Sequence, residues 1–417
     1  MRLLSKIIFA ADAAAAAALL IRPNTDDYRK ILLSGVPMMD VRSPVEYEKG
    51  SIPSSFNLPL MTNDERRLVG TAYKESGQDA AIDLGHSLVQ GATKEERMTQ
   101  WIEFVNNNAD DGYLFCFRGG LRSRTVQRWI EEETGVRYPL VTGGFKAMRT
   151  FLMDELERSL ASDDVASSSS SSLLPSVSSL VVICGRTGSG KTRVINELGE
   201  KRGAIDLEGL AHHRGSSFGR LPGGQPSQID FENSVSIAFL QALNVNNEGC
   251  YDGIPRRLFV EDESNRIGNR GLPSPLVTRM KACDGIAVVD EPMKDRVEVI
   301  LQDYVFDLRR QFVISHGGSI RSGTDAHRDY CLDSLGRIRK RLGGVVYERL
   351  RGTMEAAFRE EERTGCDTTL HRVWITGLLV DYYDKMYDYQ FAQRKDKVFF
   401  KGDRNAVIEW AMNTSPS

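Results

Sequence analysis

A glycine-rich stretch at residues 185–192 (GRTGSGKT) constrains the fold of this chain more than any other feature. It follows an apolar run at 180–184 (LVVIC), which predicts a buried parallel strand, and it leads into a helical pattern over 193–200. Glycine adopts backbone conformations that other residues avoid, so the chain can turn tightly and aim successive N–H groups at one anion. The pattern therefore predicts a strand, a phosphate-binding loop and a helix, in that order.

The end of this loop supplies a positive charge and a hydroxyl group. Lys191 adds a mobile cation, Thr192 can offer its hydroxyl to a phosphate-bound magnesium ion, and the helix N-terminus adds partial positive charge. A phosphorylated ligand is expected, and the spacing alone does not say which one. The predicted phosphate-binding residues are Gly185, Gly188, Ser189, Gly190, Lys191 and Thr192.

Composition limits the class of protein. At 417 residues, with 41% hydrophobic and 27% charged residues, the chain is expected to form two or three globular domains. The net charge of −3 argues against indiscriminate binding to nucleic acid but leaves room for a local basic face. The six cysteines include no C-x-x-C pair, which favours a reducing compartment and free thiols.

Residues 1–23 form an N-terminal extension. Arg2 and Lys6 precede an alanine-rich run at 13–18, and Asp12 interrupts the apolar core that a secretory signal needs. The extension fits an organellar transit peptide about as well as a segment without function, so a cytoplasmic location is expected and an organelle stays open. No other stretch approaches the ~20 apolar residues of a membrane span, and no membrane partner is expected.

A serine-rich segment at 161–179 divides the chain. It contains six consecutive serines at 167–172 and a proline at position 175. Such a segment cannot bury enough apolar surface to fold, so it predicts a flexible linker. The predicted domains are therefore 24–160 and 180–417.

Strands and helices alternate on both sides of this linker, which predicts two α/β domains, the second with a parallel sheet and a helical C-terminal part. In the first domain, strands are expected at 36–41, 56–60, 113–116 and 136–141, and helices at 44–49, 64–90 with a break at Gly77, 123–134 and up to about 160. In the second, strands are expected at 180–184, 204–206, 257–260, 286–289 and 397–400, and helices at 193–200, 231–244, across most of 294–390 and at 405–412.

A second chemical centre is predicted where the strand at 113–116 ends. Cys116 begins a glycine-rich loop before a helix, and two arginines of this loop would join the helix dipole in stabilising a thiolate. Two functions need such a cradle: chalcogen transfer through a persulfide or selenide, and phosphate-ester hydrolysis through a cysteinyl phosphate, which the C-x5-R spacing also matches. The candidate catalytic residues are Cys116, Arg118, Gly119, Gly120 and Arg122.

The first domain resembles a rhodanese. The resemblance rests on Asp40-Val41-Arg42, on Glu46, on the Cys116 loop and on the stretch GGFK at 143–146. The loop has one more residue before its arginine than the common single-domain rhodanese pattern. That length is similar to the loop of related phosphatases. The expected fold is therefore a rhodanese-like α/β domain followed by a P-loop α/β domain.

A more specific resemblance covers nearly the whole chain. The long run that begins DVRSPVEYEKGSIPSSFNLP, with CFRGGLRS, YPLVTGGFKAMR, ICGRTGSGKT, DLEGLAHHRGSSFGR, FVEDESNRIG and YYDKMYDYQ, is similar in order to the tRNA 2-selenouridine synthase family. It extends from residue 24 to the last helix, except for the serine linker and some residues around 317–325.

The resemblance implies a transferase that acts on the wobble uridine of tRNAs for lysine, glutamate and glutamine. It implies that 2-thiouridine is S-geranylated from geranyl diphosphate, after which selenium from selenophosphate displaces the thioether. Selenophosphate synthetase is the implied selenium supplier, and no tightly bound cofactor is expected. Cys116 matches the family cysteine that selenation needs, and residues 185–192 match its Walker-type loop.

Two further groups of residues are candidates for binding. Asp206, with Asp262 or Glu263, would hold magnesium directly or through water, or would instead cap a helix or pair with an arginine. The residues expected to face the crevice at the strand ends are Asp206, Arg214, Ser217, Asp262, Glu263 and Arg266. A basic helix is expected either to contact tRNA or to be a solvated face; its residues are Arg337, Arg339, Lys340 and Arg341.

Two rival functions stay open on the motifs alone. One is an ATP-dependent kinase or NTPase fused to a persulfide carrier. The other is a scaffold that binds anions without catalysis. Geranyl diphosphate with 2-thiouridine RNA, tested against ATP alone, separates the three hypotheses.

Overall fold

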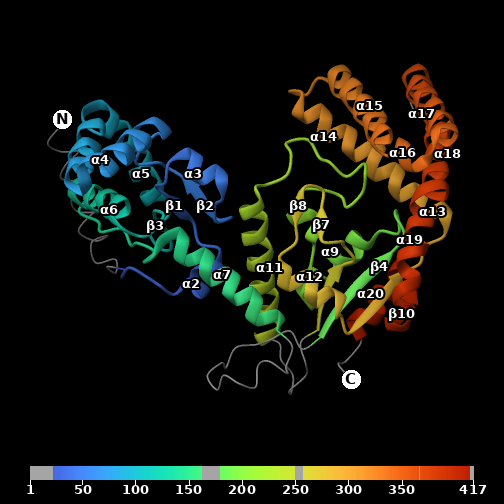
Figure 1. The fold of residues 1–417 in the computed structure, drawn as a ribbon, viewed down its shortest axis with the longest axis horizontal. Coiled ribbons are helices and arrows are strands. Elements are labelled where there is room, and N and C mark those ends of the chain that lie inside the picture. The colour runs from blue at the N-terminus through green and yellow to red at the C-terminus, as the bar shows by residue number, and fades with distance from the viewer. Residues whose placement is uncertain (1–21, 162–178, 249–256, 366, 414–417) are drawn as a thin grey trace, which may run out of the picture. The chain divides into compact units, whose positions relative to one another are not determined.

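The structure is a computed structural model, and it describes residues 22–161, 179–248, 257–365 and 367–413. Most of the N-terminal extension and of the serine-rich segment lies outside these residues. The chain divides into two compact units, Met1–Asp154 and Glu155–Ser417. Each unit is described by itself below (Figure 1).

The first unit is built on a short parallel sheet with the strand order β2-β1-β3. The strands are β1 (Met38–Asp40), β2 (Ser55–Asn57) and β3 (Tyr113–Phe115), and all three pair in parallel. Single parallel bridges from Leu114 to Leu140 and from Thr25 to Val141 extend the sheet beyond β3. Its helices are α2 (Tyr28–Ser34), α3 (Pro44–Lys49), α4 (Asn63–Leu88), α5 (Gly91–Asn107), α6 (Leu121–Thr134) and the first part of α7 (Gly144–Leu160), within which the unit ends at Asp154.

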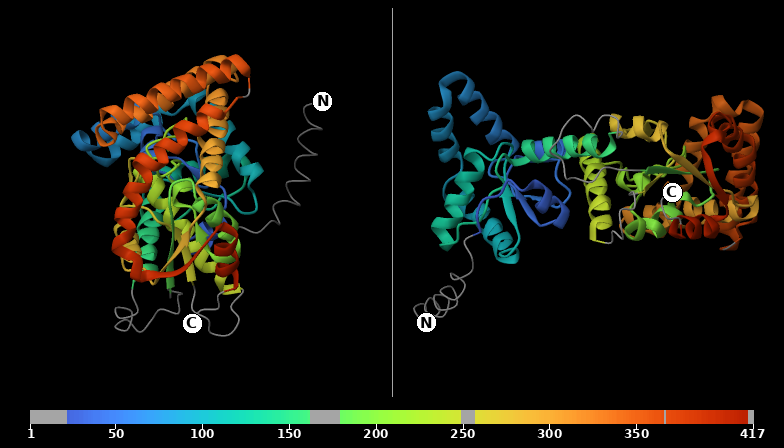
Figure 2. Two further views of the ribbon diagram at one scale, coloured as in Figure 1. Left: turned by 90° about the vertical axis from the view of Figure 1, so that its right-hand side faces the viewer. Right: turned by 90° about the horizontal axis from the view of Figure 1, so that it is seen from below.

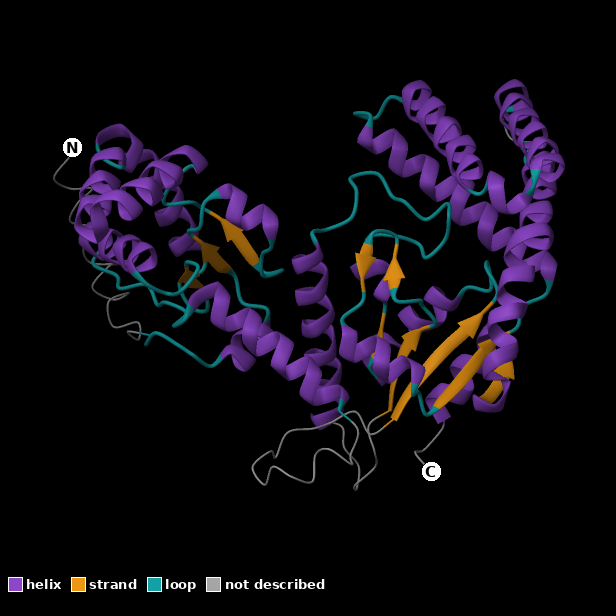
Figure 3. Cartoon of the chain, in the orientation of Figure 1, coloured by secondary structure: helices purple, strands orange, loops and turns teal. Residues whose placement is uncertain are grey.

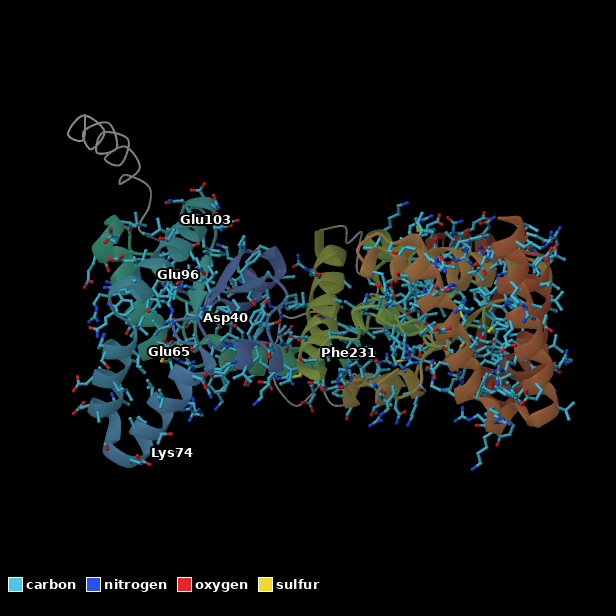
Figure 4. The ribbon with its side chains drawn as sticks, turned by 90° about the horizontal axis from the view of Figure 1, so that it is seen from above. Asp40, Glu65, Lys74, Glu96, Glu103 and Phe231 are labelled. Carbon is cyan, nitrogen blue, oxygen red and sulfur yellow. The ribbon has the colours of Figure 1, made fainter. Side chains whose placement is uncertain are left out.

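Helix α4 breaks at Gly77, as the sequence predicts. Gly77 has φ 86° and ψ −173°, a conformation that glycine tolerates best. The two halves fold back on each other. Their proximity is evident at Gly85, where a Cβ would lie 3.9 Å from the Val69 side chain. Figure 4 shows Lys74 near the tip of this helical hairpin, far from the buried Asp40 of β1. The hairpin therefore projects from the body of the unit.

The strand predicted at 136–141 is wrong as a six-residue element. Only Leu140 and Val141 form bridges, while Val136 is 51% exposed. Gly135 turns the chain with φ 74°, and Pro139 has no N–H to donate to a ladder. The apolar residues at the start of this run therefore follow a loop.

The second unit has an all-parallel sheet with the strand order β10-β9-β4-β6-β5, in which β4 is central. Its strands are β4 (Ser179–Gly185), β5 (Ala204–Ile205), β6 (Arg257–Glu261), β9 (Gly285–Val289) and β10 (Val398–Gly402). Strand order reverses at β4, because β5 and β6 lie on one side of it and the later β9 and β10 on the other. The phosphate-binding loop follows β4, at the edge of the sheet where ligands of such folds bind.

Helices cover both faces of this sheet (Figure 3). Alternate residues of β4 enter two cores: Leu180, Val182 and Cys184 join one, and Val181 and Ile183 join the other. The first core is covered by α11 (Gln228–Glu248) and α12 (Ser274–Lys281), and the second by α9 (Lys191–Arg202) and α20 (Arg404–Asn413). Between β5 and α12 lie the short α10 (Leu207–Leu210) and the antiparallel pair β7 (Arg266–Ile267) and β8 (Arg270–Gly271).

The predicted helical C-terminal part is confirmed, and its helices gather at one end of the second unit (Figure 2). Two segments, η1 and η2, are π-helical, a form that often marks functional sites. The elements are α13 (Met293–Ile300), η1 (Leu301–Asp307), α14 (Leu308–Ser315), α15 (Ile320–Arg337), α16 (Arg339–Leu342), α17 (Gly344–Thr364), α18 (Thr369–Leu378), η2 (Leu379–Tyr383), α19 (Asp384–Phe391) and the 3-10 turn η3 (Ala392–Lys397). Among the described residues, no helix combines the length and apolarity that crossing a membrane requires.

Candidate functional sites

The Cys116 loop connects β3 to α6 and is held by the segment at 143–146. The backbone N–H of Phe145 donates to the Cys116 carbonyl at 2.9 Å, and that of Lys146 donates to the Phe117 carbonyl at 2.9 Å. Gly119 has φ 60°, and a Cβ there would lie 2.7 Å from the Gly143 nitrogen. The loop backbone is therefore fixed, and a side chain at position 119 would break it.

The Cys116 side chain points into a polar corner of this loop. The residue is only 3% exposed, and its Sγ lies 3.3 Å from the Ser123 hydroxyl. The same hydroxyl donates to the Gly120 carbonyl at 3.0 Å. Arg118, by contrast, is exposed. Ser123 is not among the predicted site residues, although its position directly after the C-x5-R spacing was a usable signal.

Arg122 is held by a carboxylate from α3. Its Nη1 and Nη2 donate to the two Glu46 oxygens at 2.6 and 3.1 Å, and Arg66 pairs with Glu46 at 3.1 Å. Burial alone would raise the pKa of Glu46, but hydrogen bonds and charge from Arg122, with hydrogen bonds from Ser43, lower it to about 2. Glu46 therefore stays charged and fixes the plane of the Arg122 guanidinium.

A buried ion pair beneath the loop joins β1 to the segment that holds it. Arg42 donates to Asp40 at 2.6 Å, and its guanidinium lies 3.9 Å from the centre of the Phe145 ring. Burial raises the pKa of the Asp40 carboxyl despite the opposing effect of Arg42. The Asp40–Arg42 pair thus supports the segment that holds the cysteine loop.

The phosphate-binding loop has the predicted strand–loop–helix geometry. Gly188 and Gly190 have φ 80° and 78°, and the Lys191 ammonium donates to the Gly185 carbonyl at 2.9 Å. The Thr192 hydroxyl donates to Glu208 at 3.2 Å. Ser189 is 1% exposed, and its hydroxyl has no hydrogen-bond partner in the part of the chain that the structure describes.

Two arginine–aspartate pairs hold this loop from α19. Arg296, 2% exposed, donates to the Thr187 carbonyl at 3.0 Å and to both oxygens of Asp384 at 2.5 and 3.0 Å. Arg186, within the loop, pairs with Asp388 at 2.6 Å. These positioning residues were missed in the sequence. The only signal was that both aspartates lie in the YYDKMYDYQ stretch.

Carboxylates gather beside Lys191 and Thr192. Glu261, the last residue of β6, is fully buried and accepts from the Glu208 backbone N–H at 3.1 Å. Burial, with the charges of Glu208 and Asp206, raises the pKa of Glu261 to about 8. Burial and Glu208 also raise the pKa of Glu263. Neither Glu208 nor Glu261 was predicted, because each becomes recognisable only when β5 and β6 are placed beside β4.

A magnesium ion fits this cluster. Magnesium takes oxygen ligands and is often held by one or two carboxylates together with phosphate oxygens and water. Thr192 and Glu208 offer a hydroxyl and a carboxylate, and the Glu261 Oε1 is buried without a hydrogen-bond partner among the described residues. No three His, Cys, Asp or Glu side chains in those residues form a metal site on their own, so the ligand phosphates would have to complete the coordination.

The other residues predicted to face the crevice do not all lie in one cluster. Asp206 caps α10 by accepting from Gly209 at 2.6 Å, and burial raises the pKa of its carboxyl. Asp262 turns away to pair with Arg394 at 2.6 Å. Arg214 donates to the Asp303 carbonyl, the Ser217 carbonyl accepts from Arg337 at 3.1 Å, and Arg266 is exposed on β7.

A polar cavity of about 290 Å³ adjoins the end of the phosphate-binding loop. A Cβ at Gly190 would lie 2.8 Å from Arg404, which is one of the lining residues. The apolar side chains of the lining are those of Val194 and Ile408, and the rest are charged or polar: Arg193, Glu197, Glu291, Asp403, Arg404 and Asn405. An apolar chain attached to a loop-bound phosphate would not find a matching surface here.

The basic stretch spans a junction between two helices. Arg337 ends α15 and pairs with Asp333, whereas α16 begins at Arg339 after the buried Ile338. Its other residues are Arg339, which lies 3.5 Å from Glu348, Arg341, which donates to Tyr382 at 3.1 Å, and the exposed Lys340. The expectation of a single basic helix was therefore wrong, although the positive charges remain close in sequence.

Comparison with known proteins identifies both domains of the chain. A family model described as the tRNA 2-selenouridine synthase AAA domain matches residues 178–416, and a rhodanese-like domain model matches residues 24–150. These matches confirm the predicted order of a rhodanese-like domain followed by a P-loop domain.

Similar curated proteins cover the chain almost from end to end. The tRNA 2-selenouridine synthase of Pseudomonas syringae pv. syringae (strain B728a) is 46% identical over 392 residues, which is 94% of this chain and 98% of that protein. The one of Marinobacter nauticus is 45% identical and covers 94% and 98%. The one of Cupriavidus pinatubonensis is 45% identical and covers 95% and 100%. The chain is therefore an enzyme that belongs to the tRNA 2-selenouridine synthase family.

Proposed function

We propose that this enzyme makes 2-selenouridine at the wobble position of tRNA in two steps that use different units. The second unit transfers a geranyl group from geranyl diphosphate to the sulfur of 2-thiouridine. The first unit then supplies selenium from selenophosphate, which displaces the thioether. The proposed tRNAs are those for lysine, glutamate and glutamine, and selenophosphate synthetase is the proposed supplier.

Geranylation is a substitution at carbon. A bond forms between the uridine sulfur and C1 of the geranyl group, the C1–O bond breaks, diphosphate leaves, and the N3 proton of the base is lost. The phosphate-binding loop suits the leaving group, because its N–H groups and Lys191 oppose the charge that develops on diphosphate. A magnesium ion beside Thr192 and Glu261 would neutralise more of that charge.

Selenation is a substitution at C2 of the base. Alkylation prepares this step, because sulfur is a poor leaving group as a sulfide and a good one as a geranyl thiol. Selenium forms a bond to C2, the C2–S bond breaks, and the geranyl thiol departs. The Cys116 loop suits a selenium donor that carries phosphate, because Arg122 lies at the helix end of the loop that the thiol begins.

One observation carries the proposal: the thiol cradle and the phosphate cradle lie in separate compact units. An enzyme with a single anion-binding step needs only one of them. A kinase or NTPase would bind ATP at the phosphate-binding loop, and the Cys116 thiol would have no role in that reaction.

The test is incubation of the purified protein with 2-thiouridine RNA and geranyl diphosphate, followed by nucleoside chromatography. S-geranyl-2-thiouridine is expected, and 2-selenouridine once selenophosphate is added. ATP hydrolysis without any change in the RNA would instead favour the kinase or NTPase hypothesis. No change in the RNA and no hydrolysis would favour a scaffold.

A further inference from the structure

We propose that Cys116 attacks the phosphorus of selenophosphate, not its selenium, and passes through a cysteinyl phosphate. This inference rests on the proposed function, since it takes selenophosphate as the selenium donor. It assigns a phosphoryl-transfer activity to the rhodanese-like unit and gives Ser123 and Glu46 positioning roles in it.

Electron balance favours attack at phosphorus. Selenium in selenophosphate is already at the selenide level, and the C=Se group of the product needs selenium at that same level. Forming a Cys–S–Se bond would oxidise selenium by two electrons, and the only acceptor in the reactants is phosphorus, which would have to leave in the reduced form as phosphite. Attack at phosphorus is redox-neutral: an S–P bond forms, the P–Se bond breaks, and hydrogen selenide leaves beside the bound RNA.

The remaining steps also balance. Hydrogen selenide attacks C2 of the S-geranylated base and geranyl thiolate leaves; of the two selenide protons, one returns to N3 of the base and the other protonates the thiolate. Water attacks the phosphorus of the cysteinyl phosphate, the S–P bond breaks, and inorganic phosphate leaves. The Cys116 thiolate is thereby regenerated, as covalent catalysis requires.

The loop is built to hold a tetrahedral phosphate. Five residues separate Cys116 from Arg122, so the backbone N–H groups between them can surround the oxygens of a phosphate bound at Sγ. A Cβ at Gly120 would meet no atom within 4 Å, so there is open space at this part of the loop. A planar guanidinium donates two parallel hydrogen bonds to phosphate better than an ammonium does.

Glu46 orients the Arg122 guanidinium and leaves its Nε free to donate a hydrogen bond to a phosphate. The carboxylate accepts from Nη1 and Nη2 of Arg122, while Nε of Arg122 makes no hydrogen bond among the described residues. Arg66, paired with the same carboxylate, and the exposed Arg118 bring additional positive charge. The local charge is therefore positive even after Glu46 is counted, which favours a multiply charged anion.

Ser123 has its main role when the sulfur becomes a leaving group. Its hydroxyl lies 3.3 Å from Sγ and can rotate from the Gly120 carbonyl to donate to a thiolate. When water cleaves the S–P bond, that donation stabilises the departing thiolate. Loss of the hydroxyl should therefore slow the breakdown of the cysteinyl phosphate more than its formation.

The test uses the full chain, selenophosphate labelled with radioactive phosphorus, and no RNA. Wild type should release hydrogen selenide and inorganic phosphate, with a small labelled fraction after acid quenching. Ser123→Ala should accumulate label on the protein, on the order of ten times more than wild type, as expected for ~1.4 kcal/mol lost from the breakdown step. Ser123→Thr keeps the hydroxyl and should return the labelled fraction to the wild-type level. Cys116→Ala should carry no label.

Selenium on Cys116 with no phosphorus, shown by the selenium isotope pattern of the intact protein, would overturn the inference. Equal labelling of Ser123→Ala and wild type would also overturn it. Since this half-reaction needs neither RNA nor geranyl diphosphate, its outcome is separate from the proposed function. If label appears on Cys116 but no 2-selenouridine ever forms, the proposed function fails and the phosphoryl transfer stands.

Discussion

The two proposed anion cradles of this enzyme share one backbone arrangement but differ in their side chains. Each follows a parallel strand and precedes a helix, β3 and α6 in one case, β4 and α9 in the other. Each places a cation and a hydroxyl side by side near the helix start, Arg122-Ser123 and Lys191-Thr192. The hydroxyls differ in partner: Ser123 faces a thiol, and Thr192 faces a carboxylate.

This difference indicates that the first loop presents a nucleophile, whereas the second stabilises the charge of a bound phosphate. The first loop begins with a side chain that can form a covalent bond, and its serine hydroxyl contacts that thiol. The second begins with glycine, and its hydroxyl donates to Glu208 close to Glu261, the buried acid whose pKa is raised to about 8. The first cradle is thus suited to covalent group transfer, and the second to stabilising a leaving phosphate, with or without a metal ion.

The largest expected effect on activity is at the phosphate cradle. Lys191→Ala removes the charge opposite the leaving diphosphate, and loss of one such contact commonly lowers the rate by about 10²–10³. Geranylation should fall by this factor, measured by chromatography of nucleosides from digested RNA. Selenation of RNA that is already geranylated should be spared. Equal loss of both reactions would show that the two cradles do not act separately.

A second prediction compares the two ties that hold the phosphate-binding loop. Asp384→Asn leaves the buried Arg296 without its counter-charge, and breaking such a pair costs about 3–5 kcal/mol of unfolding free energy. The matched control is Asp388→Asn, one helical turn away on α19. Its partner Arg186 is 39% exposed, so the cost should be about 0–1 kcal/mol. Urea unfolding measures both. Equal losses would mean that burial of Arg296 does not set the strength of the tie.

A third, smaller effect concerns the ion pair between Glu46 and Arg122 of the cysteine loop. The pKa of Glu46 is lowered from its ordinary 4.5 to about 2, so its stabilising charge is present above pH 4.5 and is lost as the pH falls toward 2. Glu46→Gln should cost about 1–3 kcal/mol at neutral pH. The difference from wild type should be constant between about pH 7 and 5 and shrink below 4.5. A difference that grows on acidification would contradict the assigned ion pair.

The smallest expected effect is at the basic stretch. If Arg339 and Lys340 contact tRNA phosphates, replacing both by alanine should weaken binding and reduce the slope of log K against log salt by about 0.7–0.9 for each lost contact. The double variant should modify tRNA at the wild-type rate once the tRNA concentration is saturating. An unchanged slope in a folded variant would leave these residues as ordinary surface charge.

What the sequence predicted well was local. The glycine spacing of 185–192 and the apolar run before it specify a strand, a loop and a helix within a short span of chain, so β4 and α9 lie where expected. The break at Gly77 was predicted for the same reason. The residues that complete the sites come from far away: Arg296 lies 109 residues from the loop carbonyl that it contacts, and Asp384 lies farther still. No pattern of period 2 or 3.6 encodes such pairing.

The wrong predictions have three separate physical causes. The run at 136–141 looked like a strand by apolar content, but Pro139 removes a ladder donor. The basic run looked like one helix by composition, but the chain turns at the buried Ile338, shortly after Gly336. Asp262 looked like a crevice acid, and Arg394, distant in sequence, draws it away.

The most direct test of the division between the cradles is a mixture of two variants, neither of which can complete both steps alone. Cys116→Ala should geranylate 2-thiouridine RNA and stop there, and Lys191→Ala should selenate only geranylated RNA. Mixed in one tube with geranyl diphosphate and selenophosphate, the two should restore 2-selenouridine, because the RNA carries the intermediate from one protein to the other. If two folded variants stay inactive together, or if Cys116→Ala also fails to geranylate, the cradles form one composite site and the proposed division is wrong.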